Sequence, residues 1–198
     1  MSKKFRIIGI GEILWDVFPV GKQLGGAPTN FAYHVSAQGH EGIIISRIGN
    51  DELGNEAINY LKGMRLVTDY IQFDKNRPTG TVEVRIDDSK QPDYIIKEGV
   101  AWDFLEWRPN FKMLLKSVDA VCFGTLAQRN TISRNIILKF LGSLENNTVK
   151  ILDINLRQNF FNRQIIEESL RLSDILKLNR SELEIWVNYW KLIKNIIA

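Results

Sequence analysis

Short apolar runs alternate with stretches of helical periodicity along most of this chain. Continuous apolar runs that stop at glycine or at polar residues are typical of strands buried in a parallel sheet. The runs predicted as strands are residues 5–10, 42–49, 70–73, 120–124, 150–155 and 175–179. The stretches predicted as helices are residues 30–38, 51–63, 111–118, 131–141, 163–172 and 182–197. Strands that alternate with helices predict an α/β fold with a mostly parallel sheet and right-handed crossovers.

The middle of the chain has a different pattern. Residues 81–86 alternate apolar and polar positions with period two, and residues 93–97 return after a polar turn at 87–92. This pattern predicts an antiparallel hairpin with one apolar face. Because the hairpin interrupts the α/β alternation, we expect it to be a lid over a site or an interface. A peripheral hairpin without a function is the alternative.

The glycine-containing turn at residues 24–30 is the strongest candidate for a binding site. Gly25 and Gly26 leave bare backbone that a ligand can approach, and Pro28 stiffens the turn. A helix that begins near Asn30 would offer unpaired N–H groups to hydroxyl or phosphate oxygens. The Asn30 amide can both donate and accept, which suits a sugar hydroxyl. An ordinary strand–loop–helix corner is the other interpretation.

Two acidic residues follow the first predicted strand. A dinucleotide-binding interpretation of Gly9 and Gly11 fails, because Leu14 stands where the third glycine of the motif is required. Glu12 and Asp16 come next, at the sheet edge where open α/β sheets bind ligands. Asp16 is therefore a candidate acceptor for sugar hydroxyls, or else a loop-capping aspartate. Residues 17–22 are predicted as a short excursion before the glycine pair.

Further polar residues follow the later strands. They are Thr125, Gln128 and Arg129, then residues 153–157, and finally Asn179 with Glu182. Strand ends of a parallel sheet converge on one crevice, so these groups together suit polyhydroxylated and phosphorylated ligands. Each taken singly is more typical of a helix cap or a salt bridge. Ser181 and Glu184 have the spacing of a capping box for the last helix.

Composition narrows the classes of protein. The 198 residues are 44% hydrophobic and 25% charged, which is typical of a soluble globular protein. A net charge of +3, with scattered basic residues, gives no indication of nucleic-acid binding. Cys122 lies in an apolar run and is expected to be a buried, unreactive thiol. No signal-length or membrane-length apolar run occurs, so we expect a cytoplasmic protein without a membrane partner.

Five spaced motifs occur in a fixed order along the chain. They are residues 11–16 (GEILWD), 25–30 (GGAPTN), 49–54 (GNDELG), 153–157 (DINLR) and 179–182 (NRSE). Together they resemble the ribokinase or PfkB-type carbohydrate kinases, and most closely the bacterial fructokinases. Residues 101–103 and 124–129 are also similar to the fructokinase branch. The resemblance covers residues 5–185 and implies a ribokinase-like fold.

The resemblance implies roles for individual residues. Asp16, Gly25, Gly26 and Asn30 match sugar-binding positions, and Arg157 matches an arginine that faces sugar or phosphate oxygens. Asn179 and Glu182 match a motif that organises magnesium, phosphate and water without being direct metal ligands. The hairpin, with lid segments at about 17–24 and 79–97, matches a lid over the sugar that also forms a homodimer contact in many members. ATP and Mg²⁺ are the cofactors that the family implies.

One family motif has no counterpart in this sequence. Family members continue into a Gly-Ala-Gly-Asp segment that holds the phosphates and supplies the catalytic base, but no glycine follows Gly142 and no aspartate follows Asp174. No P-loop motif replaces it. We therefore expect a single truncated domain over residues 1–198 that lacks the C-terminal part of the fold, the base and much of the nucleotide site. The apolar face of the last helix would then cover a gap or promote aggregation.

Three hypotheses follow from these observations. The first is an ATP-dependent kinase that phosphorylates a hydroxyl of fructose or a similar sugar, inactive as this fragment. The second is a non-catalytic sugar-binding fragment or interaction module that pairs through the hairpin. The third is a broken gene product without a function. Fructose depends on the branch resemblance alone, and ribose, 2-keto-3-deoxygluconate or a nucleoside are alternatives.

Overall fold

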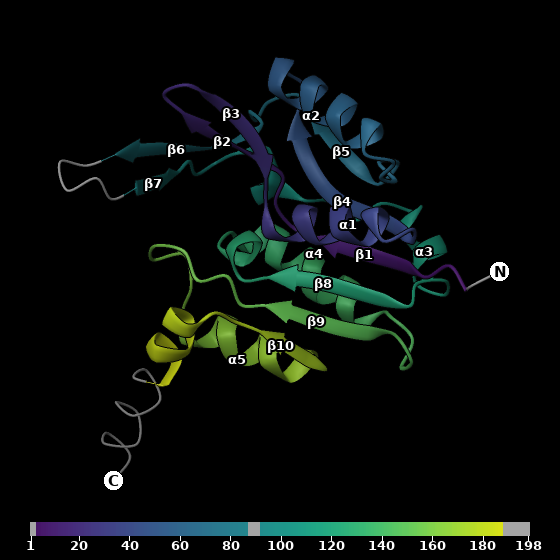
Figure 1. Cartoon of the computed structure of the whole chain (residues 1–198). Helices are drawn as coiled ribbons and strands as arrows, with labels where there is room; N and C mark the ends of the chain where they lie inside the picture. Colours follow the sequence, from purple (N-terminus) through teal and green to yellow (C-terminus); the bar gives the residue numbers. More distant parts are fainter. Residues whose placement is uncertain (1–2, 87–91, 188–198) are drawn as a thin grey trace, which may run out of the picture.

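A six-stranded parallel sheet forms the body of the molecule. The computed structural model describes residues 3–86 and 92–187. The sheet order is β10-β9-β8-β1-β4-β5, and every neighbouring pair is parallel (Figure 1). Its strands are β1 (Arg6–Ile10), β4 (Glu41–Gly49), β5 (Ile71–Asp74), β8 (Ala120–Gly124), β9 (Val149–Asp153) and β10 (Ile175–Lys177). The predicted α/β fold is confirmed.

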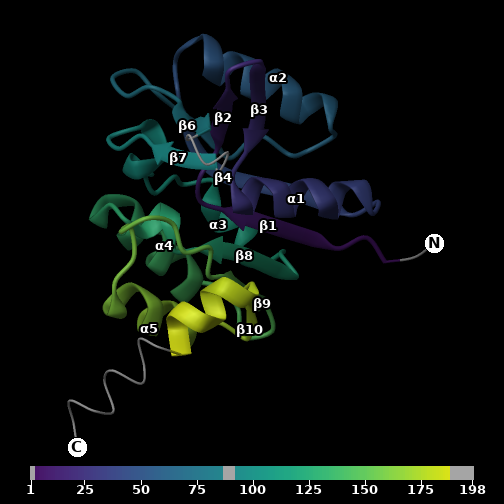
Figure 2. The ribbon, with the colours of Figure 1, turned by 60° about the vertical axis from the view of Figure 1, so that its left-hand side comes forward.

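Helices cover both faces of this sheet. They are α1 (Ala27–Ala37), α2 (Glu52–Gly63), α3 (Phe111–Leu114), α4 (Thr131–Gly142) and α5 (Arg163–Leu172), with short 3₁₀ turns η1 (Ala101–Phe104) and η2 (Leu126–Gln128). α1 and α2 lie on one face, and α4 and α5 lie on the other (Figures 1 and 2). Residues 180–187 are also helical.

Successive isoleucines of β4 point to opposite faces of the sheet and pack into two hydrophobic cores. Ile43 and Ile45 point into the cluster that contains Phe140 of α4, whereas Ile44 and Ile48 point into the cluster that contains Leu61 of α2. All four isoleucines are at most 1% exposed. Burying such a side chain contributes roughly 1.5–3 kcal/mol, so a strand with isoleucine on both faces is stable only in the middle of a layered sheet.

A second, four-stranded sheet stands beside the body, and we call it the lid sheet. Its strands are β2 (Leu14–Phe18), β3 (Gly21–Gly25), β6 (Gly80–Ile86) and β7 (Pro92–Ile96), in the order β3-β2-β6-β7. The pairs β2–β3 and β6–β7 are antiparallel, and β2–β6 is parallel. The predicted hairpin is thus confirmed as β6–β7, and residues 87–91 of its turn lie outside the described residues.

Three local predictions need correction. Residues 17–22, predicted only as a short excursion, form the end of β2, the turn at residues 19–20 and the start of β3. Helix α1 begins at Ala27 and not near Asn30, since Gly26 is the N-cap and Pro28 suits the first turn. The helix predicted over residues 111–118 ends at Leu114. Asp51 is the N-cap of α2, because its side chain accepts a hydrogen bond from the Gly54 N–H.

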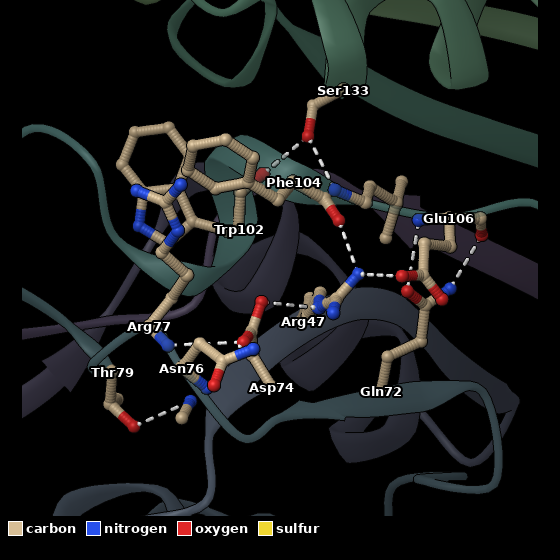
Figure 3. A network of polar contacts seen from close by, with 12 residues as sticks. Arg47, Gln72, Asp74, Asn76, Arg77, Thr79, Trp102, Phe104, Glu106 and Ser133 are labelled. Atoms are coloured by element: carbon tan, nitrogen blue, oxygen red, sulfur yellow. Dashed lines mark hydrogen bonds and ion pairs between the residues drawn. The ribbon is translucent and has the colours of Figure 1, made fainter.

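A polar network fixes the chain just before β6 (Figure 3). Arg47 of β4 forms ion pairs with Asp74 at 2.9 Å and with Glu106 at 2.7 Å, and it donates to the Phe104 carbonyl. Asp74 Oδ1 accepts from the N–H groups of Asn76 and Arg77. Asp74 thus links the segment that leads into the lid sheet to Arg47 of the main sheet.

Asp51 holds the same segment from the other end. Its Oδ2 accepts from the Thr79 N–H at 2.8 Å, and its Oδ1 accepts from the Thr79 hydroxyl at 2.6 Å. These hydrogen bonds lower the pKa of the Asp51 carboxyl, although its partial burial acts in the opposite direction. The GNDELG motif at residues 49–54 thus positions the start of β6.

Candidate functional site

A cavity of about 690 Å³ lies between the lid sheet and the carboxyl ends of the parallel strands. In Figure 1 the strands β6 and β7 project at the left, on the side to which β8 and β9 point. The lining residues are Glu12, Leu14, Asp16, Gly26, Ala27, Asn30, Phe31, His34, Val82, Tyr94, Ile96, Cys122, Leu126, Ile151, Asp153, Asn155, Arg157 and Lys177. The cavity therefore has a roof from the lid sheet that is mostly apolar apart from Asp16, and a floor that carries the other charged residues.

The predicted glycine turn forms part of that floor. Gly26 has a φ of 110°, and a Cβ there would lie 2.4 Å from the Glu12 carbonyl oxygen. Only glycine fits both conditions, because an L side chain is strained at that φ and would overlap the backbone. The Thr29 hydroxyl also donates to the Glu12 carbonyl at 2.9 Å. The turn is consequently fixed to the end of β1, with Asn30 exposed on the cavity wall.

Asp16 lies in β2, so it reaches the cavity from the lid sheet and not from the main sheet. A Cβ on Gly25 would lie 2.6 Å from Asp16 Oδ2. Gly25 thus contributes by leaving room for this carboxylate, although it does not itself line the cavity. Partial burial raises the pKa of Asp16, and the positive charge of Arg157 opposes that rise.

Glu12 is the site residue to which the sequence analysis gave no role. Glu12 is one of the residues that line the cavity, yet it is only 1% exposed. Oε1 accepts from the Ala27 N–H at 3.0 Å, whereas Oε2 has no hydrogen-bond partner among the described residues. Burial raises the pKa of Glu12 to about 7, against an ordinary value of 4.5, and the charge of Asp153 adds to the rise. The signal in the sequence was its place directly after Gly11 at the end of a strand.

The end of β9 supplies a second set of charges. Asp153 pairs with Lys177 of β10 at 2.8 Å, and both side chains line the cavity. Asn155, which has a φ of 42°, turns the chain toward Arg157, and the Thr125 hydroxyl donates to the Ile154 carbonyl. Arg157 is exposed at the cavity and acts electrostatically on both Asp16 and Glu12. The predicted residues Asp16, Gly26, Asn30 and Arg157 therefore meet at one cavity.

Asn179 and Glu182 lie outside this cavity and form a capping box. Asn179 Oδ1 accepts from the Glu182 N–H at 2.9 Å, and Glu182 Oε2 accepts from the Asn179 N–H at 2.8 Å. Glu182 Oε1 accepts from the Leu156 N–H. The predicted box of Ser181 and Glu184 was wrong by two positions, because the helix begins at residue 180. The role of Asn179 and Glu182 toward magnesium and phosphate stays a prediction.

The polar residues after β8 also have structural partners. Gln128 donates to the Gly124 carbonyl and to Ser169, both at 2.9 Å. Arg129 pairs with buried Asp103 at 2.8 Å and stacks on the Trp102 ring. Neither Gln128 nor Arg129 lines the cavity, so sequence placement at a strand end did not by itself identify site residues.

Burial raises the pKa of the Cys122 thiol to about 12, as expected for an inert cysteine. Within residues 3–86 and 92–187, no helix has both the length and the apolar character needed to cross a membrane. The same part of the chain contains no group of three or more His, Cys, Asp or Glu side chains placed to hold a metal ion.

Comparison with known proteins identifies the family. The family described as pfkB family carbohydrate kinase matches residues 8–191. The chain belongs to the pfkB family. This assignment agrees with the ribokinase-like fold and with a cavity that lies under an inserted lid sheet.

Relatives of this pfkB-family chain include several sugar kinases. The sugar kinase PH1459 of Pyrococcus horikoshii is 28% identical over 193 residues, which are 89% of this chain and 62% of that protein. The 5-dehydro-2-deoxygluconokinase of Clostridium botulinum (strain Eklund 17B) is 24% identical, over 93% of this chain and 60% of that protein. The pfkB-family chain thus spans about 60% of the length of these relatives.

Solved structures show the same fold. The crystal structure of PH1459 in complex with ATP superposes with a TM-score of 0.82 and 27% identity, covering 92% of this chain and 66% of that one. The fructokinase of Vibrio cholerae O395 superposes with a TM-score of 0.80 and 21% identity, covering 93% of this chain and 66% of that one. At 21% identity, the superposition with the Vibrio cholerae fructokinase shows similarity of fold alone.

Proposed function

We propose that this pfkB-family chain forms the sugar-binding part of a kinase that transfers phosphate from ATP to a hydroxyl of fructose or a similar sugar. The observation that carries the proposal is that Asp16, Gly26, Asn30 and Arg157 line one cavity. These residues come from the lid sheet, the glycine turn, α1 and the loop after β9. Their meeting is thus a product of the fold and not of sequence proximity.

The chemistry of the cavity suits a polyol. An ionised Asp16 accepts hydrogen bonds from hydroxyl groups, Asn30 both donates and accepts, and the Arg157 guanidinium donates to hydroxyl or phosphate oxygens. Leu14, Val82 and Ile96 of the lid sheet supply apolar contact for the carbon skeleton. A sugar has these two kinds of surface, so the roof and the floor would contact different parts of the same ligand.

The choice of sugar follows from resemblance. Relatives that match this chain are named fructokinase or 5-dehydro-2-deoxygluconokinase, and others only sugar kinase. We therefore place fructose first and test it beside ribose, 2-keto-3-deoxygluconate and 5-dehydro-2-deoxygluconate.

Nucleotide and magnesium are assigned to the complete kinase. Phosphoryl transfer depends on positioning and on stabilising charge, and the family's phosphate-binding helix and base lie in a segment with no counterpart in these 198 residues. Glu182 has both carboxylate oxygens engaged by backbone N–H groups, which supports a positioning role for it in the complete kinase and not direct coordination of magnesium. We expect the 198 residues alone to bind sugar without phosphorylating it.

The binding part is tested by calorimetry with the sugar panel. We expect one sugar to bind and Asp16→Ala to weaken that binding by roughly 1–3 kcal/mol, the effect of leaving polar partners unmet. Asp69→Ala is the matched control, because this exposed aspartate does not line the cavity. Unchanged affinity of the Asp16 variant would remove Asp16 from the site, and no binding of any sugar would refute the proposal.

The catalytic part is tested with labelled ATP, Mg²⁺ and the same sugars. No transfer by the 198-residue chain is the expected result. Robust transfer to one sugar would show that the base and the phosphate-binding groups lie within these residues.

A second candidate is an interaction module that pairs through the lid sheet. β7 is an edge strand, and Tyr94 and Ile95 on it are 46% and 36% exposed. Since Ile96 lines the cavity, the alternation of a strand directs Ile95 away from it. Ile95→Lys should convert a homodimer into a monomer in sedimentation velocity. A wild-type chain that is already monomeric would exclude this candidate.

A further inference from the structure

One buried oxygen at the cavity has no partner among the described residues. Glu12 Oε1 accepts from the Ala27 N–H, which ties the glycine turn to the end of β1, but Oε2 makes no hydrogen bond in the described structure. Buried polar atoms are nearly always paired, so an unpaired one requires an explanation. Glu12 is one of the residues that line the cavity, so a ligand bound there is the candidate for the missing partner.

The structural task of Glu12 does not explain a carboxyl group. Holding the Ala27 N–H needs a single acceptor, and a neutral amide would provide it without placing an acid in the interior. Burying an ionised carboxylate with one hydrogen bond is unfavourable by several kcal/mol. The second oxygen therefore points to a function beyond the anchoring of the turn.

We propose that Glu12 contacts the ligand, and that its Oε2 carries a proton which it donates to a hydroxyl or carbonyl oxygen of the bound sugar. This inference rests on the proposed sugar-binding function. Oε1 is already the acceptor for Ala27, so a proton on the carboxyl group belongs on Oε2. The cavity would then present a donor at Glu12, an acceptor at Asp16, and a group that does both at Asn30.

Burial favours a neutral Glu12, and the surrounding charges act in both directions. The ionisable groups that line the cavity with it are Asp16 of β2, His34 of α1, Tyr94 of β7, Cys122 of β8, Asp153 of β9, Arg157 of the loop after β9 and Lys177 of β10. The charge of Asp153 disfavours a second negative charge on Glu12, and Arg157 acts in the opposite direction. Lys177 is held by Asp153 and makes no ion pair with Glu12 in the described structure. With a pKa of about 7, Glu12 exchanges its proton close to neutral pH.

The test is the pH dependence of sugar affinity between pH 5.5 and 8.5, measured by calorimetry with the sugar that the wild-type chain binds best. Wild-type affinity should be constant below pH 7 and fall toward tenfold per pH unit above it. Glu12→Gln should bind with a nearly constant affinity, because an amide donates at every pH while its oxygen still accepts from Ala27. Glu12→Leu should bind at least tenfold more weakly at pH 6.

Glu145→Gln serves as the matched control, since it removes the same charge from an exposed turn that does not line the cavity. Its pH profile should follow that of the wild type. Thermal unfolding of each variant at pH 6 separates a folding defect from a binding defect. Tight binding by the folded Glu12→Leu variant would overturn the inference directly.

Three other outcomes would also overturn it. A flat wild-type profile with weaker binding by Glu12→Gln would make Glu12 an ionised acceptor. A pH dependence that persists in Glu12→Gln would assign the titration to another group, such as His34. Loss of binding in Asp16→Ala, with wild-type binding in both Glu12 variants, would refute this inference alone. If the wild-type chain binds no sugar, the proposed function fails and this inference falls with it.

Discussion

Two buried glutamates, one at each end of the described fold, have opposite surroundings. Glu182 is 4% exposed, and both of its oxygens accept backbone N–H groups, from Asn179 and Leu156. Glu12 is 1% exposed and has one such partner. Depth of burial is thus nearly equal, while the number of hydrogen bonds differs. The satisfied carboxylate holds the chain, and we infer that the unsatisfied one contacts a ligand.

The two regions differ in how they position their acid. Glu182 caps a helix and also accepts from the Leu156 N–H, so it ties the start of that helix to the loop after β9. Glu12 is fixed by Ala27, which lies across the whole β2–β3 hairpin. The contacts of Glu182 lie outside the cavity, whereas the contact of Glu12 joins the end of β1 to the start of α1 at the cavity.

The largest difference between the two acids should appear in the pH dependence of stability. Because folding raises the pKa of Glu12 from 4.5 to about 7, its contribution to stability is complete below pH 4.5 and is lost as the pH rises through 7. At about 1.4 kcal/mol per pKa unit, wild type should lose about 3 kcal/mol relative to Glu12→Gln between pH 4.5 and 8. Urea unfolding at several pH values measures this difference. Parallel stability curves for the two proteins would contradict the assignment.

Glu182→Ala should have the next largest effect. It removes the acceptor of two backbone N–H groups, one of them on buried Leu156, so we expect the free energy of unfolding to fall by about 2 kcal/mol at pH 7. Urea unfolding with Glu145→Ala as the control measures the loss. A change below about 0.5 kcal/mol would mean that solvent replaces both hydrogen bonds.

Asn179→Ala removes the other half of the capping box. The Glu182 N–H loses its side-chain acceptor, which typically lowers stability by about 1 kcal/mol. Asn179→Ser should recover most of this loss, because serine is also a good N-cap. Equal stability of the alanine and serine variants would indicate that the cap is not the source of the effect.

Glu184→Ala should change stability least. The one ion pair of Glu184 within residues 3–86 and 92–187 is an exposed pair with Arg180 at 3.3 Å, and such pairs contribute less than about 1 kcal/mol. We expect a change within about 0.5 kcal/mol in the same urea experiment, reduced further by salt. A larger loss of stability would mean that Glu184 contributes more to the start of this helix than an exposed ion pair can.

The sequence predicted the main sheet well because its strands are long apolar runs, as in residues 42–49. It missed β2 and β3 because β3 is short and mostly polar, so its pairing with β2 carries no apolar signal. The start of α1 was misplaced because Gly26 caps it through backbone geometry, without a side-chain hydrogen bond. Both errors concern features that depend on contacts made in the folded chain.

The candidate site was predicted in part. Motif resemblance pointed to Asp16, Gly26, Asn30 and Arg157, and the structure brings them to one cavity. Motif resemblance did not indicate the roof residues Val82 and Ile96, because their place at the cavity depends on how the lid sheet packs against the main sheet. Glu12 was visible as a strand-end acid, but its free oxygen is a property of three-dimensional packing.

The parallel pairing of β2 with β6 has a consequence for the order in which the cavity forms. Leu14 pairs with Gly80, and Val17 with Glu83, so strands far apart in the sequence must meet before the lid sheet exists. Contacts of such large sequence separation form late, because closing the intervening loop carries an entropic penalty. During synthesis on the ribosome, the glycine turn and Glu12 would therefore emerge well before the roof that encloses them.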